Sequence, residues 1–334
     1  LAGRVMNGLH SKLGQDCFIE LKPLSAQDAT DLLNLWLAEA GRILQPRQLG
    51  HLLTNFKPLY LRLAFEEAKC WRSYEGIPQG KVGEKGLSDT IQGLIHNLFT
   101  RLSSERHHGQ TLVAAFLGYL TAARHGLTEN ELLDILARDL DVYSWFIKNS
   151  LHTPYDLLKC AQTYLVERRV QAVSEKDAKE WLAQLCEQEN DQDLHRFLAE
   201  VWEEGQKLRL PMVLWSRLYA DLEPYLTQRA ADRTSLLGFY HKTSFGQVVK
   251  DTYLQGSRAQ QRHQSLATYF QEEPLFSIPE KGGIANRRKL SELPYQQAHG
   301  RLWDSLQITL TDFTFLQAKV GAMGPHPLIE DYDE

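Results

Sequence analysis

Cysteine is scarce in this sequence, and the few cysteines form no recognisable pair. Cys17, Cys70, Cys160 and Cys186 are the only four among 334 residues. No two of them have C-x-x-C spacing, which excludes a zinc ribbon and a thioredoxin-like redox motif. Sparse cysteines without a disulfide framework are typical of proteins in a reducing compartment. We therefore expect free, buried thiols and a cytoplasmic protein.

The sequence also lacks an excess of one charge and a long apolar run. It has 37 basic and 42 acidic residues, so its composition indicates neither a nucleic-acid binder nor a membrane-surface binder. No apolar run reaches the roughly 18 residues that a membrane-spanning helix needs. The chain begins at Leu1 without an apolar leader, so we expect a fragment of a longer protein. Its 334 residues are enough for two or three domains.

Catalytic and metal-binding motifs are missing as well. The sequence contains no G-x-S-x-G nucleophile elbow and no H-E-x-x-H zinc motif. Its 12 histidines are scattered. The adjacent His107 and His108 would point apart on a helix, and we interpret them as a solvated pair. We predict no catalytic residue and no metal site on this chain.

A glycine-rich segment, GIPQGKV at 76–82, superficially resembles a phosphate loop. Such a loop needs G-x-x-x-x-G-K-[ST] between a strand and a helix, because its backbone N–H groups hold phosphates and its hydroxyl reaches magnesium. Here only three residues separate Gly76 from Gly80, and Val82 stands where the hydroxyl residue should be. We therefore interpret residues 75–87 as a linker.

Helical patterns, in contrast, are abundant. After one short strand expected at 16–21, Ser25 and Asp28 form an N-cap pair before an amphipathic helix that Gly41 closes. A second helix is expected at 46–56, and a third begins after Pro58.

The middle of the chain predicts three helices followed by a two-stranded hairpin. Ser88 is expected to cap the first helix, and Thr128 with Glu131 forms a capping box for another. The extended runs, the turn between them and the helices that follow are expected at 223–228, 235–241, 229–234, 244–255 and 259–271. Three helices and a hairpin are the layout of a winged helix, and the chain as a whole is predicted to be mostly α.

A polar, helix-patterned stretch at 140–208 interrupts that layout. Its apolar stripe is expected to form core and consists of Trp181, Leu182, Leu185, Leu194, Phe197 and Leu198. The tail at 290–320 is helical in pattern and is expected to end in an acidic coil. The basic run 287–289 is interpreted as a solvated turn.

The helix after Pro211 would be the recognition helix if the winged helix read DNA. It carries Arg217 against Asp221 and Glu223, so it has no basic face for a nucleic-acid groove. We therefore expect no nucleic-acid partner.

Several of these stretches, in this order, resemble the regions that follow the nucleotide-binding core of STAND-class NTPases, especially NACHT and WD-repeat proteins. "FIELKPLSAQDATDLLNLWLAEAGRILQPRQLGHLLTN" and "KPLYLRLAFEEAK" resemble their helical lid. "LVAAFLGYLTAARHGLTENELLDIL", "LPMVLWSRLYADLEPYL" and "LLGFYHKTSFGQVV" resemble their winged helix. "HQSLATYF" and "RRKLSELPYQQAHGRLWDSLQITLTDFTFLQAKV" resemble the helical connector toward a repeat-built sensor.

The resemblance implies two nucleotide-binding positions in the full-length parent. A lid-helix proline that packs on the adenine matches Pro58, and a winged-helix histidine that reaches the β-phosphate of ADP matches His241 at the end of a strand. A histidine N–H can hold a diphosphate and thereby favour one of two conformations. The Walker A loop and the Walker B strand are absent from this sequence. ADP or ATP with magnesium is therefore expected in the parent and not on this fragment alone.

The implied domains are the end of the nucleotide-binding core at 1–22, a helical lid at 23–87, a winged helix at 88–255 with its insert at about 140–208, and a helical connector at 256–334. The implied function is regulatory: the segment holds an ADP-bound inactive state and transmits sensor engagement to oligomerisation. Parents of this kind serve innate immunity, cell death or antiphage defence.

The expected partners are the missing nucleotide-binding core and repeat sensor of the same protein, further copies on activation, and other proteins, but no membrane. Two alternatives stay open. One is a non-enzymatic α-helical adaptor for protein interactions, and the other is a winged-helix transcription regulator.

Overall fold

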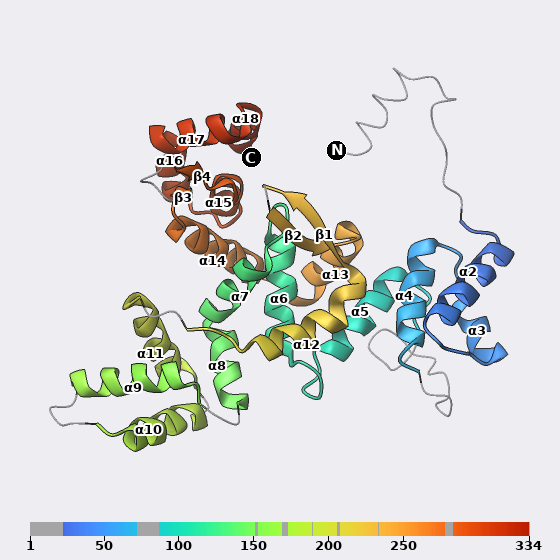
Figure 1. Ribbon diagram of the computed structural model, residues 1–334, viewed down its shortest axis with the longest axis horizontal. Helices are drawn as coiled ribbons and strands as arrows, with labels where there is room; N and C mark the ends of the chain where they lie inside the picture. The colour runs from blue at the N-terminus through green and yellow to red at the C-terminus, as the bar shows by residue number, and fades with distance from the viewer. Residues whose placement is uncertain are drawn as a thin grey trace. The chain divides into compact units, whose positions relative to one another are not determined.

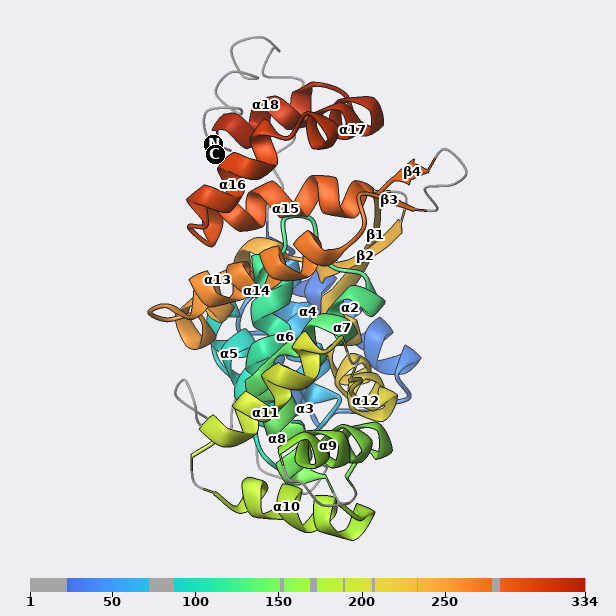
Figure 2. The same cartoon turned by 90° about the vertical axis from the view of Figure 1, so that its left-hand side faces the viewer.

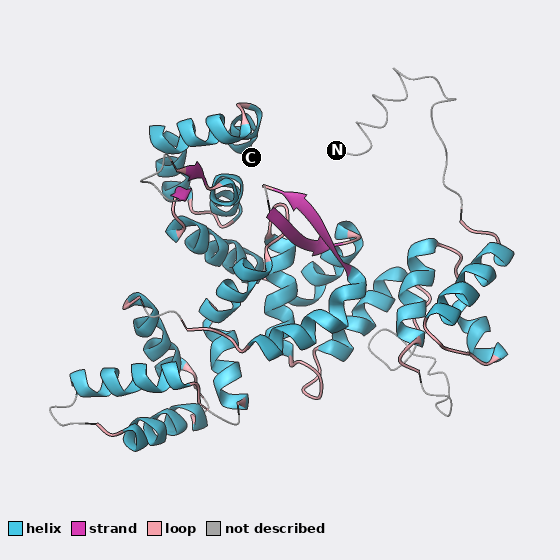
Figure 3. Ribbon diagram, viewed as in Figure 1, coloured by secondary structure: helices cyan, strands magenta, loops and turns pink. Residues whose placement is uncertain are grey.

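The computed structural model describes residues 23–71, 87–150, 153–168, 173–188, 190–205, 208–232, 234–277 and 283–333. The strand expected at 16–21 and the glycine-rich segment at 76–82 lie outside these residues. Helices dominate the described part of the chain, and its strands form two small antiparallel hairpins (Figure 3). This confirms the mostly α fold. The chain divides into two compact units, residues 1–97 and 98–334, which are described separately below.

The described residues of the first unit form helices and the loops that join them. Its helices are α2 (Ala26–Glu39), α3 (Pro46–Leu52), α4 (Pro58–Ala68) and the start of α5 (Ile91–Leu102). Ser25 caps α2 as predicted, since its hydroxyl accepts a hydrogen bond from the Asp28 N–H at 3.1 Å. α3 ends at Leu52, before the expected Phe56. One cause of a break before α4 is that the residue preceding a proline disfavours helical geometry.

Ser88 does not cap α5 as predicted. The Thr90 hydroxyl accepts from the Gly93 N–H at 3.0 Å, and the Thr90 carbonyl accepts the first helical bond. Ser88 is buried, and its carbonyl accepts a hydrogen bond from the hydroxyl of Tyr60 on α4. Burial raises the pKa of Tyr60, which therefore stays a neutral donor.

The second unit contains the winged-helix arrangement (Figure 1). Its three helices and its wing are α6 (Gln110–Ala122), α7 (Glu129–Arg138), α12 (Met212–Leu222), β1 (Leu226–Ala231) and β2 (Thr234–Phe239). Trp215 of α12 packs on Phe116 of α6 and donates its indole N–H to Glu129 of α7, which ties the three helices together. The capping box of Thr128 and Glu131 on α7 is confirmed.

The connection between α6 and α7 adds a short third edge to the wing. Leu127 and Leu237 of β2 exchange backbone hydrogen bonds of 3.1 and 2.8 Å. Gly126 makes this approach possible, since its φ is +109° and a Cβ there would lie 2.2 Å from the Leu237 carbonyl oxygen. The hairpin pairs Leu226 with Phe239 and Ala231 with Thr234. The turn expected at 229–234 was therefore predicted too long, because most of those residues are paired.

Four helices lie between α7 and α12 and share one apolar cluster. They are α8 (Leu140–Asn149), α9 (Tyr155–Arg168), α10 (Glu175–Glu187) and α11 (Gln192–Glu203). Phe197 is fully buried in this cluster and makes edge contacts with Tyr164 and Trp181. The prediction that the apolar stripe forms core is confirmed. In both ribbon views these helices lie to one side of α6 and the wing (Figures 1 and 2).

The rest of the second unit is again mainly helical. Its elements are η2 (Glu223–Tyr225), α13 (Lys242–Tyr253), α14 (Arg258–Glu272), β3 (Phe276–Ser277), β4 (Ile284–Ala285), α15 (Arg287–His299), α16 (Trp303–Thr311), α17 (Phe313–Met323) and α18 (His326–Asp333). The acidic end was expected to be coil but forms α18. Tertiary contacts hold it there: the Asp331 carboxylate pairs with the fully buried Lys319 of α17.

Two expectations from composition concern membrane-spanning helices and the state of the cysteines. No helix among them is long and apolar enough to cross a membrane. The described cysteines are free, as expected, but Cys70 is exposed and Cys160 and Cys186 are only half-buried. Their expected burial was therefore wrong. Cys17 lies outside the described residues. The domain boundaries expected from the resemblance remain predictions.

Candidate functional site

His241 follows the wing and lies at the start of a helix. β2 ends at Phe239, two residues before the expected strand end, and His241 is the N-cap of α13. Phe245, one turn into α13, is fully buried and stacks on Phe239 with ring centroids 5.3 Å apart. It also contacts Phe99 and Tyr225. This aromatic anchor fixes the turn that presents His241.

The imidazole of His241 is exposed and has one polar contact with the part of the chain that the structure describes. Its Nδ1 accepts a hydrogen bond from the Ser244 N–H at 3.4 Å, which caps α13. When Nδ1 accepts, the proton of a neutral imidazole is on Nε2. An Nε2–H that faces solvent beside a helix N-terminus is well placed to donate to an anion, because the helix dipole also favours negative charge there.

Pro58 occupies the first turn of α4 in the first unit. It is exposed, and the preceding Lys57 has extended backbone geometry. The Lys57 N–H is satisfied by the side-chain oxygen of Asn55 at 3.1 Å. A proline at this position starts a helix without losing a hydrogen bond. Pro58 and His241 lie in different units, and the nucleotide contacts inferred for both remain predictions.

His107 and His108 do not form the solvated pair that we expected. His108 is buried, with 7% of its surface exposed, and its Nε2 lies 2.7 Å from the Asp221 carboxylate of α12. The partner is over 100 residues away in sequence, so local spacing could not reveal it. The described residues contain no group of three or more His, Cys, Asp or Glu side chains that could hold a metal ion.

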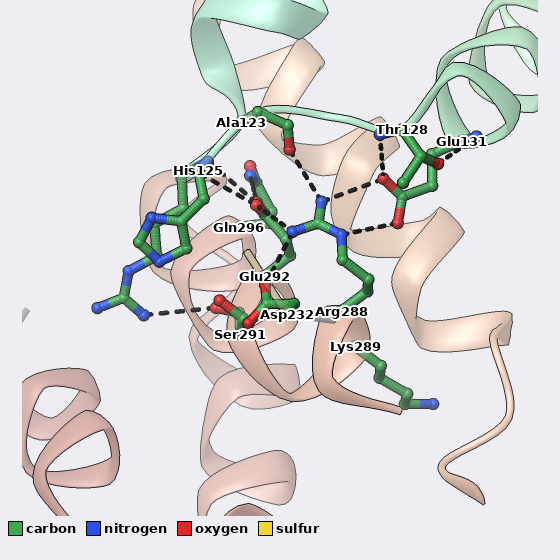
Figure 4. Close-up of polar contacts among 12 residues, drawn as sticks. Ala123, His125, Thr128, Glu131, Asp232, Arg288, Lys289, Ser291, Glu292 and Gln296 are labelled. Atoms are coloured by element: carbon green, nitrogen blue, oxygen red, sulfur yellow. Dashed lines mark hydrogen bonds and ion pairs between the residues drawn. The ribbon is translucent and has the colours of Figure 1, made fainter. Parts of the chain in front are cut away.

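A buried charge cluster joins the winged helix to α15. At its centre the Arg288 guanidinium makes a two-pronged contact with Glu131 of α7, at 2.8 and 3.1 Å (Figure 4). It also donates to Asp232 at the wing turn, to Glu292 one turn along α15, and to the Gly126 carbonyl at 2.9 Å. One side chain of α15 therefore contacts α7, the wing turn and the α6–α7 connection.

The charges of this cluster are compensated by donors that the fold supplies. Arg288 faces three carboxylates, and the side chains of Arg288, Glu131 and Asp232 are at most 10% exposed. Burial by itself would lower the pKa of Arg288, but Glu292, Glu131 and Asp232 more than offset this and raise it. The Thr128 N–H donates to Glu131 at 2.8 Å, at the positive end of the α7 dipole. All three carboxylates thus receive guanidinium donors, and Glu131 also receives a backbone donor.

Glu292 is fully buried and holds the α6–α7 connection. Its carboxylate accepts from the backbone N–H groups of Arg124 and His125, at 3.0 and 3.3 Å, and from the side-chain amide of Gln296 at 2.8 Å (Figure 4). The Arg124 side chain continues the cluster to α18, because it donates to Asp331 at 3.0 Å. Charged hydrogen bonds of this kind are among the stronger ones in proteins.

The basic run 287–289 was wrongly interpreted as a solvated turn. Asn286 caps α15, and all three basic side chains lie in its first turn and make specific contacts. Arg287 donates to the Ala322 carbonyl. Lys289 donates to the Gln271 and Glu273 carbonyls at 2.8 and 2.7 Å. The carboxylates of Glu131 and Asp232 that pair with Arg288 come from distant segments, so no local pattern could indicate them. The one local signal was Glu292, four residues after Arg288, which is the spacing of a helical ion pair.

Comparison with known proteins agrees with this architecture. Residues 82–165 match the family described as "NWD1-like, winged helix-turn-helix domain". The human NACHT domain- and WD repeat-containing protein 1 is 31% identical over 352 residues, which cover 96% of this chain and 18% of that protein. The human NACHT and WD repeat domain-containing protein 2 is 32% identical over 217 residues, which cover 58% of this chain and 12% of that protein. No solved structure matches the chain.

These similarities define the class of the chain: it is a NACHT-type segment that contains a winged helix. The proteins to which it is homologous are NACHT and WD-repeat proteins 1 and 2, and the resemblance inferred from sequence is confirmed. The chain spans 18% of the length of the first of these relatives.

Proposed function

We propose that this chain is the regulatory segment of a STAND-type signalling ATPase. In this proposal the winged helix holds an ADP-bound inactive state through His241, and the C-terminal helices transmit sensor engagement to oligomerisation. ADP or ATP with magnesium binds the nucleotide-binding core of the parent, with Pro58 packed on the adenine. The parent acts in the cytoplasm, in innate immunity, cell death or antiphage defence.

The observation that carries the proposal is the Arg288 cluster. A regulatory segment must convert a displacement of its C-terminal helices into a displacement of the nucleotide contact. Arg288, which is paired with Glu292, joins α15 to the wing turn and to α7 through buried, charged hydrogen bonds. Removing one partner from such a cluster leaves uncompensated buried charge, so α15 and the winged helix are expected to move as one body.

The test is nucleotide retention by a protein that carries both this segment and the nucleotide-binding core. His241→Ala removes the helix cap and the Nε2 donor together. His241→Asn keeps a side-chain acceptor for the cap but not a donor at the position of Nε2. We expect both variants to lose ADP and to signal without a trigger. His326→Ala is the matched control, because His326 is 83% exposed. Wild-type ADP retention by both His241 variants would contradict the clamp.

An α-helical adaptor is the second candidate function. Several large apolar side chains of the C-terminal helices are well exposed, among them Trp303 at 59%, Ile308 at 70% and Phe313 at 75%. Exposed apolar surface of this kind is typical of protein contacts. In contrast, α12 presents Arg217 beside Asp221, which does not favour a transcription regulator. An intact partner interaction in a protein whose nucleotide binding is abolished would favour the adaptor.

A further inference from the structure

The connection between α6 and α7, residues 123–126, is held from two sides. On one side Lys242 of α13 donates its Nζ to the carbonyls of Ala123 and Arg124, at 3.2 and 2.9 Å. On the other side, Glu292 of α15 accepts from the N–H groups of Arg124 and His125 (Figure 4). The carbonyls of this connection thus face a cation, and its amides face an anion.

Lys242 and Glu292 each lie next to a residue on which the proposed function depends, namely His241 and Arg288. Lys242 directly follows His241, so its contact fixes the first residue of α13 to the connection. Glu292 is one helical turn from Arg288, whose guanidinium donates to the Gly126 carbonyl. A continuous path of hydrogen bonds therefore runs from α15, through four residues of backbone, to the residue next to His241.

A lysine near the C-terminal carbonyls of a helix is a common capping arrangement, and that role alone would not couple two elements. Two features go beyond capping. Lys242 belongs to a different helix from the carbonyls that it contacts. The Arg124 peptide groups are also shared: its N–H is held by Glu292 and its carbonyl by Lys242. A shift of the connection that breaks one contact therefore changes the geometry of the other.

We infer that Lys242 and Glu292 are positioning residues that act through residues 123–126 to set the position of His241 relative to α15. The inference rests on the proposed function in one respect, namely that His241 contacts a diphosphate. A displacement of α15 shifts the Glu292 carboxylate and, with it, the amides of Arg124 and His125. The carbonyls of Ala123 and Arg124 then move and carry Lys242 at the start of α13 with them. Phe245 stays buried in its aromatic cluster, so the change is confined to the first turn, where His241 lies.

The first experiment uses the 334-residue chain itself and needs no nucleotide. Hydrogen exchange is compared between wild type, Glu292→Gln and Lys242→Met. The matched controls are Glu272→Gln, whose carboxylate is 57% exposed on α14, and Lys250→Met, an exposed lysine of the same α13. Each control removes the same charge without touching residues 123–126.

We expect Glu292→Gln to speed exchange at residues 124 and 125 by about tenfold or more, because charged hydrogen bonds are lost. The relay predicts that exchange also rises at Ser244 and Phe245, on the far side of the connection. Lys242→Met should in turn speed exchange at residues 124 and 125. Neither control should change either region. The inference is overturned if Glu292→Gln speeds exchange only at residues 124 and 125 while Lys242→Met speeds it only at Ser244 and Phe245.

A double variant distinguishes a shared path from a general loss of stability. If the two residues act through one path, the fold-change in exchange at residue 125 in Lys242→Met/Glu292→Gln is smaller than the product of the single effects. If the effects multiply, the two residues act independently and the inference is wrong.

The second experiment separates this inference from the proposed function. In a protein that also carries the nucleotide-binding core, Lys242→Met should shorten ADP retention although His241 is intact, and Lys250→Met should not. If His241→Ala retains ADP normally, the proposed function fails, whatever the exchange data show. If His241→Ala loses ADP but Lys242→Met and Glu292→Gln do not, only the positioning role fails.

Discussion

Replacing Arg288 with methionine is the most direct test of how the winged helix is joined to α15. The substitution keeps most of the side-chain length and removes the guanidinium. Its donors to Glu131, Asp232, Glu292 and the Gly126 carbonyl all disappear. Three carboxylates then remain near one another at a site where the Glu292 side chain is fully buried.

The expected loss of unfolding free energy follows from what each carboxylate retains. Breaking a buried ion pair by removing one partner typically costs about 3–5 kcal/mol. Glu131 keeps the Thr128 N–H, and Glu292 keeps two backbone N–H groups and the Gln296 amide. These remaining donors place the expected loss near the lower end, at about 3 kcal/mol.

Urea unfolding followed by circular dichroism measures the loss, and hydrogen exchange on α7 and α15 locates it. Arg196→Met is the matched control, because Arg196 is 65% exposed and its pair with Asp193 is worth less than about 1 kcal/mol. Arg288→Lys should fall between wild type and Arg288→Met, since a lysine keeps the charge but not the two-pronged geometry. If Arg288→Met has wild-type stability and wild-type exchange at α15, the proposed role of Arg288 in joining α15 to the winged helix is refuted.

Three further outcomes are expected. Gly126→Ala should cost at least about 2 kcal/mol in urea unfolding, because φ is +109° there and a Cβ would meet a wing carbonyl, whereas Gly238→Ala, in open space, should change stability by less than about 0.5 kcal/mol. Phe197→Ala should cost about 3–5 kcal/mol and raise hydrogen exchange in α9 to α11 first; equal effects on α6 would contradict a separate cluster there. Burial lowers the pKa of His263, so the unfolded state takes up the proton first and stability falls below about pH 6.5. His263→Gln should reduce that fall and the exposed His326→Gln should not, as urea unfolding at several pH values would reveal; an unchanged pH profile in His263→Gln would exclude this role.

Local signals predicted much of the secondary structure. The caps at Ser25 and at Thr128 were readable because a capping side chain and its partner lie three residues apart. Errors arose where the deciding partner was not local. The cap of α5 is Thr90, whereas the Ser88 hydroxyl accepts from the Thr90 N–H and the Ser88 carbonyl accepts from Tyr60 of α4. α18 is a helix at a terminus where composition indicated coil, and the buried pair between Lys319 and Asp331 holds it in place.

The candidate site was only partly readable. His241 was singled out by the resemblance to the winged helix of STAND-class NTPases, and its place as the N-cap of α13 required the structure. Arg288 lay in the basic run 287–289 that we interpreted as a solvated turn, and Glu292 lay in the tail that was predicted only to be helical. Glu131, which pairs with Arg288, and Arg124, whose N–H donates to Glu292, lie more than 150 residues away along the chain, and no periodic pattern encodes such a distance.

The sequence by itself determined that this protein is mostly helical, where most helices lie, and that it resembles the NACHT and WD-repeat proteins. These properties follow from periodicity, caps and the order of short motifs, all of which depend on neighbouring residues. Only the tertiary structure decided which charges are buried and which elements they join. The free energy of burying a charge depends on every donor and acceptor that surrounds it, and those around Arg288 come from α7 and the connection before it, from the wing turn and from α15 itself.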